Sequence, residues 1–233
     1  MNKDDKKELK PKKVRKEKNV ENKLDKKDKI IRIAILSVVI IATVIFATFI
    51  GVSYLKSRTK PEEVAPVKID DAIDSYGYQL AENATPYYKE LFNKLKILLN
   101  TPDFEEEEYG KLITQMFAAD FYDLNTKLTN SDIGGMEFVT PLIRENFRLA
   151  AQNTIYSGVE NNIYGDRTQK LPVVKSINVT SVNRVNYNYQ GKGDPNAMRV
   201  SFTIEYEEDL GYPKESSVVL VHLNDKLEIT KVN

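Results

Sequence analysis

The feature that most constrains this chain is an apolar run from Ile33 to Leu55, IAILSVVIIATVIFATFIGVSYL, which contains no charged residue. As a helix, a run of this length spans roughly 34 Å at about 1.5 Å per residue, and a hydrocarbon core is about 30 Å thick. Because a helix satisfies its own backbone in lipid, we predict a transmembrane helix over residues 30–55. A cleaved signal peptide is the weaker alternative, since residues 1–32 precede the run and no A-x-A site follows it.

Charges on either side of this run predict its orientation. Residues 13–32 carry nine Lys and Arg, whereas residues 56–75 carry four. The positive-inside rule therefore places the N-terminus in the cytoplasm and the C-terminal part outside. The expected location is the cell membrane, crossed once, with an extracytoplasmic domain.

Composition divides the rest of the chain. Residues 1–29 are almost devoid of apolar side chains and are predicted to be a disordered, basic cytoplasmic tail. This tail favours contact with anionic membrane lipid. Nucleic acid is not an expected partner, because acids interrupt the basic residues and aromatics are absent. Residues 56–68, with Pro61 and Pro66, are predicted to be a stalk linker.

The region 69–233 contains no cysteine, which excludes disulfides, thiolate nucleophiles and cysteine-ligated metals. Its first half follows helical spacing, with Thr-Pro pairs that predict a capped start at Thr85-Pro86 and again at Thr140-Pro141. The predicted helices cover residues 69–82, from 86 to Asn100, from about 103 to Leu124, and from 141 to about Asn153.

The second half alternates with a period of two. A strand is predicted from Val174 to Tyr189, with a phase slip near Ser181-Val182 that suggests a bulge. A turn over 190–195, a clean strand over 198–206, a second turn over 208–215 and a terminal hairpin of 217–223 with 227–232 follow. Helices followed by an antiparallel meander indicate an α+β fold, with the helices packed on one sheet.

This order of elements, with the stretches MRVSFTIEYEEDLG and SSVVLVHLNDKLEITKV, resembles the nuclear transport factor 2-like, or cystatin-like, fold. The resemblance implies a cone in which helices pack into a strongly curved antiparallel sheet. Together with the tail, single span and stalk, the layout resembles the bitopic assembly subunit of type IV secretion and conjugation systems. It implies an interaction role with protein partners in the envelope, including a possible homo-oligomer.

Two groups of residues are candidates for interaction. The first is the loop NTKLTNSDIGGME, where Asp132, Gly134 and Gly135 predict either a tight turn or a backbone nest for an anion. Long loops carry function disproportionately, so this loop is a natural target for mutation. The second is the pair Tyr187 and Tyr189, since tyrosine is favoured at interfaces.

No catalytic, cofactor-binding or metal-binding residues are predicted. The run from Glu105 to Glu108 is typical of an acidic first helical turn, and His222, the only histidine, is expected on a sheet face. We therefore expect a membrane-anchored, non-enzymatic interaction or assembly module of an envelope or conjugative secretion complex. A small-ligand-binding sensor is the alternative. A hydrolase or isomerase with carboxylates on the cone floor is disfavoured, because the strand 198–206 puts apolar residues on one face.

Overall fold

A computed structural model describes residues 68–189 and 191–233. The description below concerns the compact unit Ala65–Asn233. The predicted tail, transmembrane helix and most of the stalk lie outside the described residues. Within the part that is described, no helix combines the length and the apolar character needed to cross a bilayer.

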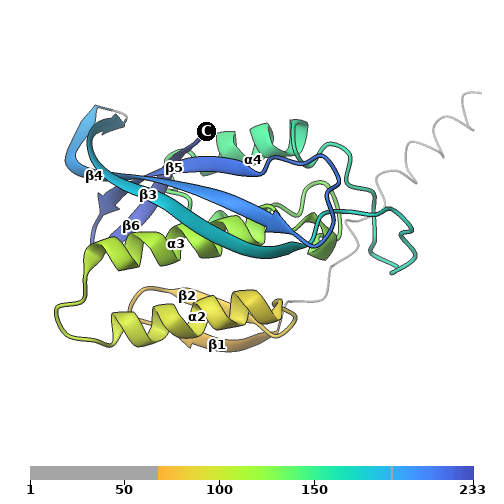
Figure 1. The fold of residues 1–233 in the computed structure, drawn as a ribbon, viewed down its shortest axis with the longest axis horizontal. Coiled ribbons are helices and arrows are strands. Elements are labelled where there is room, and N and C mark those ends of the chain that lie inside the picture. The colour runs from red at the N-terminus through yellow and green to blue at the C-terminus, as the bar shows by residue number, and fades with distance from the viewer. Residues whose placement is uncertain (1–67, 190) are drawn as a thin grey trace, which may run out of the picture. The chain divides into compact units, whose positions relative to one another are not determined.

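The domain is an α+β fold in which three helices pack against a four-stranded antiparallel sheet (Figure 1). The helices are α2 (Pro86–Leu99), α3 (Glu106–Phe121) and α4 (Arg144–Asn153). The sheet has the order β3-β4-β5-β6, formed by Val174–Tyr189, Lys192–Tyr206, Glu215–Leu223 and Lys226–Val232. The α+β prediction is therefore confirmed, and the meander follows the predicted order of strands.

The prediction of a helix over residues 69–82 is wrong. These residues form a separate antiparallel hairpin of β1 (Ile69–Ile73) and β2 (Tyr78–Ala81). The turn ends at Gly77, whose φ of 67° suits glycine. Tyr78 and Leu80 are buried while Gln79 between them is exposed, which is the period of a strand. The helical spacing of the apolar residues was therefore coincidental.

The start of α2 is as predicted. Thr85 has extended backbone angles, and its side chain accepts a hydrogen bond from the backbone N–H of Tyr88 at 3.1 Å, with Pro86 at the first helical position. The prediction that Thr140 begins the next helix in the same way is wrong, because α4 begins at Arg144 after Ile143.

Tertiary pairing explains this difference. The backbone N–H of Thr140 donates to the carbonyl of Ile229 at 3.0 Å, and Val139 forms an isolated parallel bridge with the same residue. The segment Val139–Thr140 thus covers the free edge of β6. Two short 3-10 helices, η1 (Leu124–Thr126) and η2 (Met136–Phe138), flank the loop that precedes it.

The bulge predicted near Ser181-Val182 is confirmed by a register shift between Val179 and Ser181, and further shifts lie between Val174 and Ser176 and between Val185 and Tyr187. The predicted turn over 190–195 is shorter than expected, because β4 already begins at Lys192 and pairs with Tyr189. The terminal hairpin is confirmed, with Asn224 at its turn in the left-handed region.

The main core lies between the helices and one face of the sheet. α3 lies along the sheet, and α2 and the β1–β2 hairpin lie on the other side of α3 (Figure 1). Fully buried side chains come from each layer, among them Phe92, Leu95, Ile113, Phe117 and Phe202. Each such side chain contributes about 1.5–3 kcal/mol by leaving water.

Candidate functional site

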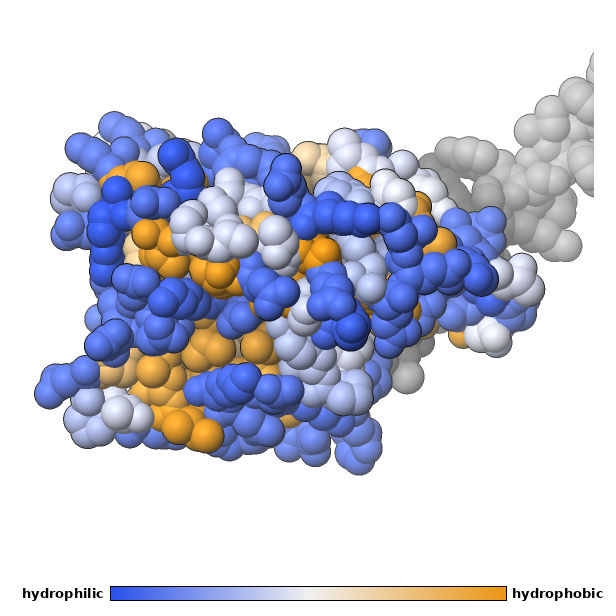
Figure 2. All heavy atoms as spheres, viewed as in Figure 1, coloured by the Kyte–Doolittle hydropathy of each residue, from blue (hydrophilic) through white to orange (hydrophobic). Residues whose placement is uncertain are grey.

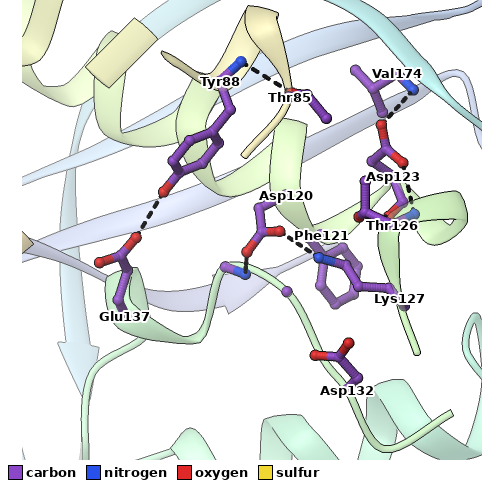
Figure 3. A network of polar contacts seen from close by, with 12 residues as sticks. Thr85, Tyr88, Asp120, Phe121, Asp123, Thr126, Lys127, Asp132, Glu137 and Val174 are labelled. Atoms are coloured by element: carbon purple, nitrogen blue, oxygen red, sulfur yellow. Dashed lines mark hydrogen bonds and ion pairs between the residues drawn. The ribbon is translucent and has the colours of Figure 1, made fainter. Parts of the chain in front are cut away.

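The predicted loop of Asp132, Gly134 and Gly135 lies beneath the C-terminal end of α3 (Figure 3). We call the residues that fix it the loop network, which comprises Asp120, Lys127, Gly134, Gly135 and Tyr156. Asp120, in the last turn of α3, accepts a hydrogen bond from the backbone N–H of Gly135 at 2.6 Å. Its other oxygen pairs with the ammonium group of Lys127, which is 5% exposed. One carboxylate therefore holds both ends of the loop.

Both glycines are required because the loop backbone lies very close to α3. A Cβ on Gly134 would collide with the backbone carbonyl of Asp120, and a Cβ on Gly135 would lie 2.6 Å from the ring of Phe117. Gly135 also has a φ of 69°. The loop is thus pressed directly onto the backbone and core side chains of α3, which only glycine permits.

Tyr156 completes the network from the other side. Its buried hydroxyl donates to the carbonyl of Phe121 at 2.7 Å and accepts the N–H of Gly134 at 3.0 Å. Burial raises the pKa of Tyr156 well above its usual value, so the hydroxyl stays a donor. The N–H groups of Gly134 and Gly135 therefore both have acceptors within the protein, which is the arrangement of a tight turn.

Asp132 and Asp123 close the turns beside this network (Figure 3). Asp132 accepts the N–H of Leu128 at 2.9 Å. Asp123, 2% exposed, accepts the N–H groups of Thr126 at 3.3 Å and Val174 at 3.2 Å, so it joins η1 to the start of β3. Burial raises the pKa of Asp123, although these hydrogen bonds oppose the effect.

Glu137 extends the polar contacts toward α2 (Figure 3). The hydroxyl of Tyr88 donates to its carboxylate at 2.7 Å. Removal of water from around it raises the pKa of Glu137, and the hydrogen bond from Tyr88 acts in the opposite direction. The loop thus contacts α2 and α3, and Asp123 beside it contacts β3, so that polar atoms join these elements.

Tyr187 and Tyr189 lie elsewhere, at the tip of the β3–β4 hairpin. With Val185 they pack against a small apolar cluster of Ala197, Val219 and Val221. These three residues are 0% exposed and form a second core, separate from the main one. The tip and the loop are not brought together, so the two groups of predicted interaction residues do not form one site.

A third group was not anticipated from the sequence, and we call it the histidine cluster: Glu106, Arg184, Asp194 and His222. Nδ1 of His222 lies 2.8 Å from Asp194 Oδ2, and Nε2 lies 2.6 Å from Glu106 Oε1. Arg184 donates to the other oxygen of Glu106 at 2.7 Å. The predicted roles hold locally, since Glu106 is in the acidic first turn of α3 and His222 lies on β5. Glu106 and His222 are 116 positions apart, and no local sequence pattern predicts that they come into contact.

The described surface also carries an open groove of about 610 Å³ between α2, α3 and β3. Apolar side chains from all three elements line it, and Ile97 is 69% exposed. In Figure 2 an apolar patch lies on this side of the molecule. The rim cations Lys94 and Lys111 are paired with acids of their own helices. The lining comprises Lys94, Ile97, Leu98, Thr101, Glu108, Lys111, Leu112, Gln115, Asn178 and Val179.

Within residues 68–189 and 191–233, no group of three or more His, Asp and Glu side chains is arranged to hold a metal ion. In the histidine cluster both ring nitrogens already face carboxylates. No family model, no curated protein and no solved structure matches this chain.

Proposed function

We propose that this protein is a single-pass membrane-anchored, non-enzymatic interaction module whose folded domain works outside the cytoplasm. The observation that carries the proposal is the uncharged run Ile33–Leu55 with its basic N-terminal flank. The finer fold we propose for the domain is the cystatin-like cone. By resemblance, the host would be an envelope or conjugative secretion complex in which the domain contacts partner proteins or further copies of itself.

The groove between α2, α3 and β3 is the surface that best supports a partner-binding role. Ile97, Leu98 and Leu112 present apolar surface there, beside β3 at the edge of the sheet. Both backbone groups of Ile177 are already satisfied by Tyr87, whose hydroxyl accepts the N–H at 2.9 Å, and by Gln115, which donates to the carbonyl at 2.9 Å. A partner at this groove would therefore gain from apolar contact more than from strand pairing at Ile177.

A small-ligand sensor is the second candidate, and the size of the same groove supports it. Ligand sites commonly measure about 300–1,000 Å³, and this groove measures about 610 Å³. Thermal melts of the protein against a metabolite panel distinguish the two candidates. A ligand at a hundred times its dissociation constant stabilises the folded state by about 2.7 kcal/mol, whereas a protein-docking surface gives no small-molecule response.

Membrane topology is tested first. Since the chain has no cysteine, single-cysteine variants Lys12→Cys and Asn183→Cys report the two sides of the predicted span without background. A membrane-impermeant maleimide added to intact cells should label Asn183→Cys and spare Lys12→Cys until the cells are lysed. Labelling of Lys12→Cys alone in intact cells would overturn the proposed topology.

The docking role is tested by a photo-crosslinking amino acid placed at Ile97, with Asn153 on the exposed end of α4 as the control position. At native expression a discrete adduct is expected from position 97 and not from 153. An adduct of twice the mass of the chain identifies a second copy, and a different mass identifies another protein. Recovery of monomer alone from both positions would contradict the interaction role.

A further inference from the structure

The tip of the β3–β4 hairpin extends beyond the rest of the sheet. β3 and β4 pair as far as Tyr189 and Lys192, but the pairing of β4 with β5 stops at Met198 and Leu220. In Figure 1 this end of the hairpin bends away from β5 and β6. The tip therefore lacks the backbone ladder to β5 that holds the remainder of β4, and other contacts must fix its position.

The tip covers apolar surface. Val185, Tyr187 and Tyr189 pack against the cluster of Ala197, Val219 and Val221, and the two valines of this cluster belong to β5 and are fully buried. The neighbouring residues of β5, Val218 and Leu220, belong to the main core instead. Both faces of β5 are thus buried, and the second face depends on the position of the tip.

Polar contacts to His222 hold the tip where the ladder ends. Asp194 accepts hydrogen bonds from the backbone N–H of His222 at 2.8 Å and from Asn196 at 2.9 Å, and it faces the imidazole Nδ1. Arg184 donates to the carbonyl of Asn196 at 2.9 Å and to Glu106. Since Glu106 also faces Nε2, these side chains tie the tip to β5 and to the start of α3.

The protonation state of His222 decides how many of these contacts are favourable. Only the imidazolium donates from both ring nitrogens, whereas a neutral imidazole places a lone pair against one carboxylate. With His222 charged, two carboxylates face two cations, His222 and Arg184. From β6 the residue paired with His222 is Leu227, which is apolar and offers no compensating charge.

We propose that Glu106, His222 and Asp194 form a proton-dependent latch, in which the imidazolium fastens the tip of the β3–β4 hairpin and loss of its proton loosens the tip from Val219 and Val221. The latch depends on contacts within the described domain and not on the proposed membrane topology or partner.

The direction of the pH dependence follows from the surroundings. Partial burial lowers the pKa of His222, but the hydrogen bonds to Asp194 and Glu106 outweigh it, so that the pKa is raised above 6.5. Partial burial raises the pKa of Glu106 and of Asp194, but the bonds from His222 and other donors leave both below their usual 4.5 and 3.8. The latch is thus fully closed between about pH 4.5 and 6.5 and loosens as the pH rises through the raised pKa of His222.

The first measurement is a titration of His222, whose signal is unambiguous because the chain has one histidine. The full-length chain, labelled with ¹³C at histidine Cε1 and held in detergent micelles, is titrated by NMR. The pKa of His222 is expected above 6.5, to fall in Glu106→Gln, and to stay unchanged in Glu107→Gln. Equal values in wild type and Glu106→Gln would overturn the latch.

The second measurement follows the tip itself. Hydrogen exchange detected by mass spectrometry compares peptides of the hairpin tip with peptides of β5 at pH 5.5 and 8.5, corrected for intrinsic exchange. In wild type, the protection of the tip should fall at least tenfold more than the protection of β5 when the pH is raised from 5.5 to 8.5. In His222→Gln and Glu106→Gln this pH dependence should disappear. A tip that follows β5 at both pH values, or that keeps its pH dependence in both variants, would overturn the proposal.

Discussion

The two ends of α3 carry polar clusters that differ in burial and in charge balance. At the C-terminal end, the loop network surrounds Lys127, which is 5% exposed, and Tyr156, which is fully buried. At the N-terminal end, the side chain of His222 in the histidine cluster is 35% exposed and that of Glu106 is 40% exposed. Both clusters join segments that are distant in sequence to the same helix. A comparison of the two therefore shows how burial changes the behaviour of a polar cluster.

Burial makes the first cluster a fixed structural joint and leaves the second open to titration. In the loop network, backbone N–H groups, a helix carbonyl and one ion pair satisfy each other at close range, and removal of any member leaves a partner without a bond. In the histidine cluster, water reaches the groups and a proton changes the balance of charges. We therefore expect large, pH-independent losses at one end and small, pH-dependent losses at the other.

The largest effect is expected for Gly134→Ala in the loop network. The new Cβ would collide with the backbone carbonyl of Asp120, which cannot move without disturbing α3. We expect a loss of about 3 kcal/mol or more in the free energy of unfolding. Chemical denaturation of the full chain in detergent, followed by near-ultraviolet circular dichroism, measures it.

Gly158→Ala is the matched control, because a Cβ there meets nothing within 4 Å. A change of about 1 kcal/mol or less is expected, with stabilisation permitted by the reduced freedom of the unfolded chain. If both alanine variants behave alike, close packing of the loop on α3 is not what requires glycine.

Several local features of the fold show what the sequence could and could not predict. The cap at Thr85, the bulge near Ser181 and the terminal hairpin depend on neighbouring residues, and the local pattern predicted them. Thr140 carries the same Thr-Pro pattern as Thr85 but pairs with Ile229 of β6 instead. Tertiary pairing thus overrode a local preference of about 1 kcal/mol.

The candidate sites divide in the same way. Gly134 and Gly135 form a turn, in agreement with the tight-turn interpretation of the sequence. The sequence did not indicate that Asp120 and Tyr156 bind the backbone of this turn. The histidine cluster draws on α3, β3, β4 and β5, and no periodicity aligns residues so far apart. Only the sheet register and the docking of α3 bring Glu106 to His222.

The next largest effect is expected for Lys127→Met. Removing the ammonium group leaves Asp120 with the N–H of Gly135 but without its ion pair. Breaking a fully buried pair costs about 3–5 kcal/mol, and the 36% exposure of the Asp120 side chain reduces this, so we expect about 2 kcal/mol. The same denaturation assay applies. Lys94→Met, which removes an exposed pair with Glu90 on α2, should change stability by about 0.5 kcal/mol or less.

Tyr156→Phe tests the neutral part of the loop network. The variant keeps the ring but leaves the N–H of Gly134 and the carbonyl of Phe121 without their buried partner. The expected loss is about 2 kcal/mol, equal at pH 5.5 and 8 because no ionisation is involved. Tyr206→Phe, whose hydroxyl bonds the carbonyl of Pro213 at the exposed surface, should cost less than about 1 kcal/mol. If the loss of stability in Tyr156→Phe depended on pH, the proposed contrast between the two ends of α3 would be wrong.

The smallest effect is expected at the N-terminal end, where Glu106→Gln is compared with Glu107→Gln. Both glutamates lie in the first turn of α3 and interact alike with the helix dipole, but Glu106 alone contacts His222 and Arg184. Glu107 pairs instead with Lys111 of the same helix at 3.0 Å, an exposed contact worth about 0.3–0.5 kcal/mol. The difference in unfolding free energy between the two variants therefore reports the contacts of Glu106 less this smaller contact of Glu107. It should be about 0.5–1 kcal/mol, because the groups are partly exposed to water.

The same difference should depend on pH in both directions. The lowered pKa of Glu106 means that its stabilising contribution is present above about pH 4.5 and is lost as the pH falls through the lowered value. The raised pKa of His222 means that the contribution of the imidazolium is present below about pH 6.5 and is lost as the pH rises through the raised value. Denaturation at pH 3, 5.5 and 8.5 should thus give the greatest difference at the middle value. A difference that stays constant between pH 5.5 and 8.5 would show that Glu106 acts through Arg184 alone, because only the arginine keeps its charge at high pH.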